Sequence, residues 1–124
     1  MLMFIFLSMI FLHIIDDYVL QSACLSKLKQ KKFWNANAPN TLYKYDYFCA
    51  LLMHSFSWAF MIMLPLAFYK QFNVEISYLL LFMANTLIHS YIDNLKANKE
   101  KINLITDQSI HLIQIVITFI VLMI

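Results

Sequence analysis

Residues 1–20 read MLMFIFLSMIFLHIIDDYVL, an apolar run whose first ionisable side chain is His13, followed closely by Asp16 and Asp17. A helix rises 1.5 Å per residue, so about 20 residues cross the roughly 30 Å hydrocarbon core of a membrane. An ionisable residue inside such a helix is costly unless it is paired or faces a polar cavity. The stretch therefore predicts a membrane-spanning helix whose last turns carry functional side chains.

Three further apolar segments, at about 47–69, 76–95 and 105–124, are also long enough to span a membrane. Of the 124 residues, 62% are hydrophobic and 13% are charged, whereas soluble domains are about half apolar and about a quarter charged. We therefore expect an all-α integral membrane protein, a four-helix transmembrane bundle with antiparallel up-down topology. Residues 1–124 are expected to form a single transmembrane domain, with a loop at 22–46 on the cytoplasmic interface.

The lysines predict how this bundle is oriented. Eight of the nine lysines lie in the connectors after the first and third segments, and positive charge in short loops is retained on the cytoplasmic side. Both termini should therefore be outside, in a bacterial inner (cytoplasmic) membrane, with the lysines of the first connector meeting anionic headgroups. The N-terminal run lacks the basic start and the A-x-A-like cleavage site of a secretory signal, so we expect it to be retained as a span.

Histidine and aspartate recur at one spacing in the apolar segments. Three segments carry a His and an Asp four residues apart, which places both on one face of a helix. Because antiparallel helices alternate in direction, all of these residues fall within roughly 10 Å of the cytoplasmic side. One shared polar site is therefore expected. The pairs are His13 with Asp17, His89 with Asp93, and Asp107 with His111, and the remaining segment carries His54.

Imidazole and carboxylate together suit a divalent metal such as zinc, manganese or iron. These donors exceed the needs of one tetrahedral ion and would suffice for two ions bridged by a carboxylate, so one or two ions are expected. Asp17, Asp93 and Asp107 are also expected to be catalytic, with a carboxylate as general base. The predicted metal ligands are His13, Asp17, His54, His89, Asp93, Asp107 and His111. Gln21, Asn85, Gln108 and Gln114 either orient these ligands or form plain hydrogen bonds between helices.

The chain resembles a family of small bacterial and phage multi-pass membrane proteins known as domain of unknown function 3307. The chain also resembles, more loosely, membrane-bound metal-dependent hydrolases. It implies a multi-pass inner-membrane protein with a metal site, and it brings no substrate. Relatives often have a small residue where this chain has Asp16, so the sequence leaves open whether Asp16 joins the site. The pattern that carries the resemblance is His13-x-x-x-Asp17-Tyr18-Val19-Leu20-Gln21, His54, His89-x-x-x-Asp93-x-x-Lys96 and Asp107-Gln108-x-x-His111.

Three functions agree with these features. The first is a metal-dependent hydrolase acting on an amphiphilic, lipid-like substrate, for example a lipid phosphoester, at the cytoplasmic face. The second is a metal or proton transporter that uses the same residues as a relay. The third is a non-catalytic bacterial or phage membrane scaffold, in which the polar pairs only fix helix packing. The expected surroundings are the lipid bilayer, with a homo-oligomer also compatible and no nucleic-acid partner.

Overall fold

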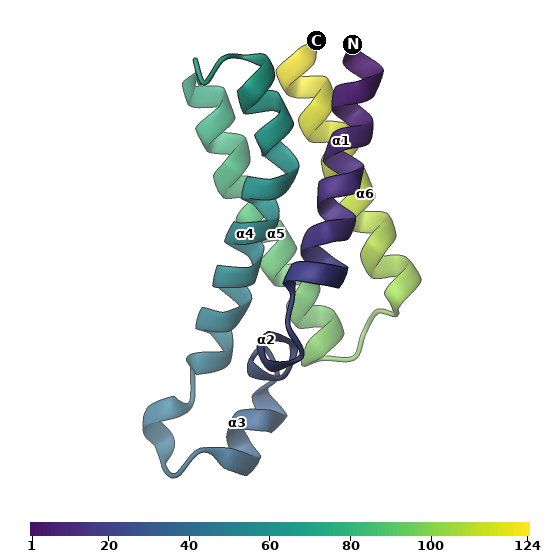
Figure 1. Ribbon diagram of the computed structural model, residues 1–124. Helices are drawn as coiled ribbons and strands as arrows, with labels where there is room; N and C mark the ends of the chain where they lie inside the picture. The colour runs from purple at the N-terminus through teal and green to yellow at the C-terminus, as the bar shows by residue number, and fades with distance from the viewer.

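The computed structural model describes residues 1–124 and is entirely helical, which confirms the predicted all-α class. Four helices are long, and shorter helical segments fill most of the connection between the first two of them (Figure 1). The long helices are α1 (Leu2–Ile15), α4 (Asp46–Tyr69), α5 (Ile76–Ala97) and α6 (Leu104–Met123). The shorter segments are the π-helix η1 (Asp16–Leu20), α2 (Ala23–Leu28), α3 (Lys31–Asn37) and the 3-10 turn η2 (Thr41–Tyr43).

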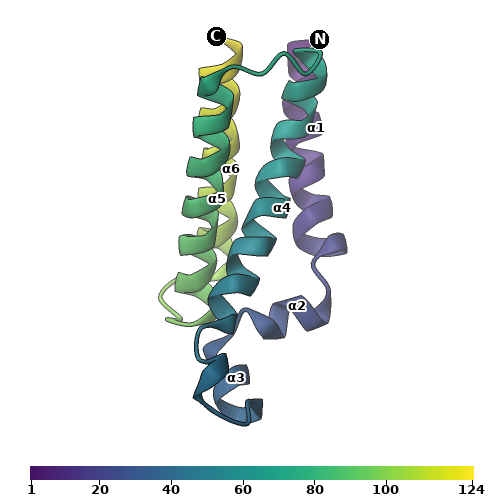
Figure 2. The ribbon, with the colours of Figure 1, turned by 90° about the vertical axis from the view of Figure 1, so that its left-hand side faces the viewer.

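The long helices lie side by side and alternate in direction (Figures 1 and 2). Both chain termini and the turn between α4 and α5 lie at one end of the molecule. The helices α2 and α3 and the connection from α5 to α6 lie at the opposite end. We call this second end the lysine end, because it carries the two lysine-rich connectors.

Three helical stretches are long and apolar enough to cross a membrane: Leu2–Leu20, Thr41–Tyr69 and Leu104–Met123. The fourth long helix, α5, has 22 residues and is also long enough to cross a membrane. Its mean hydropathy is too low for a span because it carries Asn85, His89 and Asp93, all of them buried. The sequence prediction of membrane-length apolar helices is thus confirmed for three of its four segments, and a transmembrane placement of α5 stays a prediction.

The predicted loop at 22–46 is wrong in its secondary structure, because α2, α3 and η2 lie within it. The side chain of Ser22 caps α2 by accepting a hydrogen bond of 3.0 Å from the backbone N–H of Leu25. Asn98, directly after α5, accepts from the N–H of Lys31 at 2.6 Å and donates to the carbonyl of Lys29 at 2.9 Å. These bonds attach the connection to the end of α5 and fix the backbone of Lys29 over the bundle.

The apolar core fills the half of the bundle nearest the termini. On α1 the buried side chains are Ile5, Met9 and His13, one every four residues, so a single stripe of this helix faces inward. The other face of α1 and the outer faces of the remaining helices expose many large apolar side chains, which suits a surrounding of lipid. The core cluster comprises Ile5, Met9, Trp58, Ala59, Ile62, Met63, Leu66, Ile115 and Leu122.

Candidate metal centre

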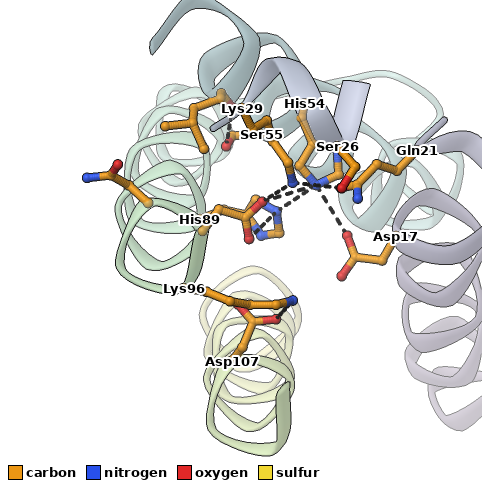
Figure 3. Close-up of polar contacts among 12 residues, drawn as sticks. Asp17, Gln21, Ser26, Lys29, His54, Ser55, His89, Lys96 and Asp107 are labelled. Atoms are coloured by element: carbon orange, nitrogen blue, oxygen red, sulfur yellow. Dashed lines mark hydrogen bonds and ion pairs between the residues drawn. The ribbon is translucent and has the colours of Figure 1, made fainter. Parts of the chain in front are cut away.

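Polar side chains from all four long helices meet in the half of the bundle nearer the lysine end. Figure 3 shows Asp17, His54, His89 and Asp107 pointing toward one another from η1, α4, α5 and α6. The predicted polar stripes therefore converge, which helix spacing alone does not ensure, because each helix is free to rotate about its axis. His89 and His111 have no exposed surface, and His13, His54 and Asp107 are almost as deeply buried.

The first group of donor atoms joins η1, α4 and α5. The Nε2 atoms of His54 and His89 are 3.2 Å apart, and Oδ1 of Asp17 is 3.4 Å from Nε2 of His54. One ligand atom from each of these three residues lies within 4.8 Å of the others. This group is therefore compact enough for all three side chains to bind one ion.

The second group joins α5 and α6 and consists of His89, Asp93 and His111, again with ligand atoms within 4.8 Å of one another. Asp93 also contacts the first group. Its Oδ2 is 3.5 Å from Nε2 of His54, and its Oδ1 is 3.5 Å from Nε2 of His111. Asp107 adds an oxygen on the far side, because its Oδ1 is 3.3 Å from the same nitrogen of His111.

These separations distinguish metal donors from hydrogen-bonded partners. Nitrogen–oxygen hydrogen bonds are about 2.7–3.2 Å long, and the histidine–aspartate contacts here measure 3.3–3.7 Å. Donors bound to one tetrahedral zinc ion at about 2.0–2.2 Å are about 3.3–3.6 Å apart. Five buried atoms in this region have no hydrogen-bond partner: Oδ2 of Asp16, Oδ1 of Asp17, Nδ1 of His89, Oδ1 of Asp107 and Nε2 of His111. The donor set therefore fits a divalent ion better than it fits a hydrogen-bonded network.

Two amides hold His111 in the tautomer that a metal ligand needs. Oε1 of Gln114 can only accept, so Nδ1 of His111 donates to it across 3.1 Å. Gln114 is oriented in turn by its amide group, which donates to Oδ1 of Asn85 at 3.2 Å. A neutral His111 protonated on Nδ1 leaves its Nε2 lone pair directed at Asp93 and Asp107.

Asp16 lies behind His54 and not among the inner donor atoms. Its Oδ1 accepts a hydrogen bond of 2.6 Å from the hydroxyl of Ser57, and its Oδ2 is 3.7 Å from Nδ1 of His54. The side chain is 1% exposed. Asp16 therefore lies on the Nδ1 side of His54, at a separation longer than a hydrogen bond. The structure thus places Asp16 next to the candidate site, a position that the sequence left open.

His13 is a predicted metal ligand that belongs to neither donor group. Its Nδ1 accepts a hydrogen bond of 2.8 Å from the indole N–H of Trp58 and is 3.6 Å from Oδ2 of Asp17. Trp58 also stacks on His89, with ring centroids 4.2 Å apart. No sequence pattern singles out Trp58, because a tryptophan in an apolar helix is normally a packing residue. Here it fixes two histidines at once.

Two lysines enter the centre from the lysine end. Nζ of Lys29 is 2.7 Å from both Oδ2 of Asp93 and Oε1 of Gln21, and Nζ of Lys96 is 2.8 Å from Oδ2 of Asp107. Lys29 is only 6% exposed, so the expectation that the lysines of the first connector all meet lipid headgroups is wrong for Lys29. A buried carboxylate attracts an ammonium group strongly, and α2 carries Lys29 to Asp93.

Lys96 lies past the predicted third span and is partly exposed. Burial acts to lower the pKa of Lys96, but the hydrogen bond to Asp107 and the negative charges of Asp107, Asp93 and Asp17 together outweigh it and raise that pKa above its usual value. Lys96 is therefore a permanent positive charge at physiological pH. The two cysteines are free and exposed, away from these groups.

Comparisons with known proteins give a family and no activity. A family model described as "Protein of unknown function (DUF3307)" matches residues 5–124, a range that includes every residue of the centre. No curated protein and no solved structure matches the chain.

Proposed function

We propose that this chain, which belongs to the DUF3307 family of proteins of unknown function, is a membrane-embedded metal-dependent hydrolase of an amphiphilic substrate. The observation that carries the proposal is the convergence of histidine and aspartate donors from four helices at separations typical of one coordination shell. Helical bundles build carboxylate-bridged metal sites in this way, from inward-facing side chains on neighbouring helices.

The charge of the centre also supports bound cations. Asp16, Asp17, Asp93 and Asp107 supply four negative charges against the two positive charges of Lys29 and Lys96, which leaves −2 when the histidines are neutral. An uncompensated charge of this size is costly in an apolar surrounding. One divalent ion neutralises it.

The donors provide for two ions that share Asp93. Asp17, His54 and His89 would hold the first ion, and Asp93 and His111 would hold the second. Oδ2 of Asp93 lies near His54 and Oδ1 lies near His111, so Asp93 is the carboxylate that both ions could share. We assign Asp17 and Asp93 to metal binding and Asp107, whose Oδ1 has no hydrogen-bond partner, to proton transfer.

Divalent ions in such sites supply a water nucleophile at neutral pH and polarise the bond that breaks. Hydrolysis of an ester by this chemistry would replace the bond from the electrophilic atom to the alcohol oxygen with a bond to the oxygen of water. Asp107 takes the proton from the water and returns it to the leaving alcohol oxygen, so the carboxylate is regenerated. Lys96 stabilises the ionised form of Asp107 through its 2.8 Å contact.

A hydrolase agrees better than a transporter with the position of these residues. Beyond Asn85, Gln114 and Thr118 no histidine, carboxylate or lysine is buried, and the apolar core closes the half of the bundle near the termini. A relay would need ionisable groups in both halves. A site open at one end of apolar helices instead suits a substrate with a polar head and an apolar tail, presented from the cytoplasmic side.

Metal analysis of the purified protein tests this function. We expect at least one equivalent of zinc, manganese or iron per chain after purification in mild detergent without chelator. His89→Ala should lose most of this metal, because His89 belongs to both donor groups. Thr86→Ala, one turn earlier on the same helix, is the matched control and should keep it, because its hydroxyl bonds only to the carbonyl of Phe82.

The helix content of both variants, measured by circular dichroism, reports whether they fold. Absence of stoichiometric metal from the unaltered protein, or equal metal content in folded His89→Ala and Thr86→Ala, would refute the proposal.

A further inference from the structure

Two polar cavities lie over the candidate metal centre at the lysine end. Their volumes are about 270 Å³ and about 240 Å³, and they share Gln21, Lys29, Asp93 and Lys96. The second cavity is also lined by Asp17 and Asp107. A molecule that enters either cavity therefore meets both lysines and a carboxylate of the centre.

The lysines have hydrogen-bond donors to spare. An ammonium group donates three hydrogen bonds, whereas Lys29 makes two and Lys96 makes one. Two of the three N–H bonds of Lys29 are taken up by Gln21 and Asp93, so the direction of the remaining N–H is fixed. Lys32 adds a third positive charge to the lining of the first cavity. Figure 3 shows Lys29 and Lys96 on different sides of the centre, with Gln21 and Ser26 beside Lys29.

From this arrangement we infer that the cavities bind the phosphate group of a membrane lipid that carries a phosphomonoester. The inference rests on the proposed function and names its substrate. Lys29 and Lys96 donate to oxygens of the phosphate from two sides, and a third side of the group faces the centre. With two divalent ions bound, the charge of the centre changes from −2 to +2, which matches a phosphomonoester dianion.

The shape of the anion favours phosphate over carboxylate. A tetrahedral phosphate directs oxygens to several sides, whereas the two oxygens of a carboxylate lie in one plane and point the same way. The groups that can bind an anion here come from the ends of η1 and α2 and from α5, so they do not form a single fork. Gln30, which lines the first cavity, has one amide N–H left beyond its bond to the carbonyl of Ser26.

The rim of the second cavity accounts for the lipid tail. Tyr18 of η1 and Leu104 of α6 line this cavity, and both are more than half exposed. Next to them in sequence, Val19 is 71% exposed and Ile105 is 76% exposed. The cavity thus opens beside apolar side chains that face outward, and acyl chains can leave it directly into the membrane. A free phosphate would make no use of this apolar rim.

Binding measurements on protein loaded with the metal found by analysis test the inference. The probes are dihexanoyl phosphatidic acid, inorganic phosphate and dihexanoyl phosphatidylcholine, titrated by calorimetry into protein in detergent below the micelle concentration of each lipid. We expect phosphatidic acid to bind, inorganic phosphate to bind more weakly, and phosphatidylcholine not to bind. Tighter binding of inorganic phosphate than of phosphatidic acid would overturn the lipid source.

Lysine variants locate the binding. Lys96→Gln should weaken phosphatidic acid binding about tenfold or more, since a hydrogen bond to a charged group contributes about 1.5–3 kcal/mol. Lys96→Arg, which keeps the charge, should stay within about threefold of the unaltered protein. Lys99→Gln is the matched control, because Lys99 is exposed near the same helix end and lines neither cavity. Lys29→Gln repeats the test at the buried lysine.

Two results would overturn the inference: no phosphatidic acid binding to metal-loaded protein, or equal weakening by Lys96→Gln and Lys99→Gln. If Lys29→Gln does not fold, the Lys96 variants still decide the question. The metal analysis is independent of these titrations. Protein that holds metal but binds no phosphatidic acid contradicts only the substrate, whereas protein without metal contradicts the proposed hydrolase itself.

Discussion

Asp16 is a single residue that can influence metal binding through its neighbour His54. The hydroxyl of Ser57 holds one carboxylate oxygen, and the other oxygen faces Nδ1 of His54 at 3.7 Å. This separation is longer than a hydrogen bond, but a metal bound to Nε2 would leave the proton of His54 on Nδ1, where the negative charge of Asp16 favours it. The neighbouring Asp17 faces Nε2 of the same ring. Two adjacent aspartates thus lie near the two nitrogens of one imidazole ring.

Asp16→Asn should therefore weaken metal binding without removing a ligand. We expect a loss of affinity of about tenfold to a hundredfold, the usual effect of replacing the partner of a metal-binding histidine. Competition with a chromogenic chelator measures it. Glu75→Gln is the control, because Glu75 is exposed and precedes α5 at the opposite end of the bundle. Unchanged affinity in a folded Asp16→Asn protein would remove Asp16 from the site.

At the scale of elements, hydropathy predicts α4, α5 and α6 to within two residues, and the first predicted segment covers α1 and the π-helix η1 that follows it. The predicted segments 47–69 and 76–95 correspond to α4 and α5, and four-residue spacing identifies most of the converging side chains. The short helices α2 and α3 were missed because they carry no membrane-length apolar run. Lys29 was missed for the same reason: a lysine near a membrane normally meets headgroups, and only the attachment of its backbone to Asn98 places it at Asp93.

The pairing of α5 with α6 depends on a buried amide cluster. Asn85 donates to the hydroxyl of Thr118 at 2.8 Å and accepts from Gln114 at 3.2 Å. Asn85→Ala should lower the free energy of unfolding by about 1 kcal/mol, the usual contribution of such contacts between helices in membranes. Unfolding by denaturant, followed by circular dichroism, measures it.

The hydroxyl of Thr86 bonds within its own helix, so Thr86→Ala should change stability less than Asn85→Ala does. Equal losses in the two variants would show that the amide cluster adds nothing to the pairing of α5 with α6. A larger loss for Asn85→Ala would also be consistent with a disturbed His111, because Gln114 connects the two residues.

At the scale of the whole molecule, the composition of α5 agrees with its place in the bundle. Its polar side chains Asn85, His89 and Asp93 are buried, while Leu80 and Met83 are exposed. Lipid would therefore contact mainly apolar atoms, although the helix as a whole is not apolar enough to qualify as a span by composition. A hydropathy average does not distinguish the two faces of a helix, so it underrates a helix whose polar face lines a site.

The placement of the lysines makes a prediction for the molecule as a whole. The lysine end should face the cytoplasm, and the turn between α4 and α5 should face outward with both termini. Two single-cysteine proteins test this orientation in intact cells with a membrane-impermeant maleimide. Cys49→Ser leaves Cys24, which is exposed on α2. Adding Asn73→Cys to a Cys24→Ser and Cys49→Ser background places a thiol in the opposite turn.

We expect the thiol at position 73 to react in intact cells and Cys24 to react only after the membrane is permeabilised. The reason is energetic, because the connectors at the lysine end hold eight of the nine lysines, and moving them across the membrane against its potential is unfavourable. Labelling of Cys24 in intact cells, with position 73 protected, would show that the lysine end faces outward. The metal centre, and any lipid substrate, would then belong to the outer leaflet.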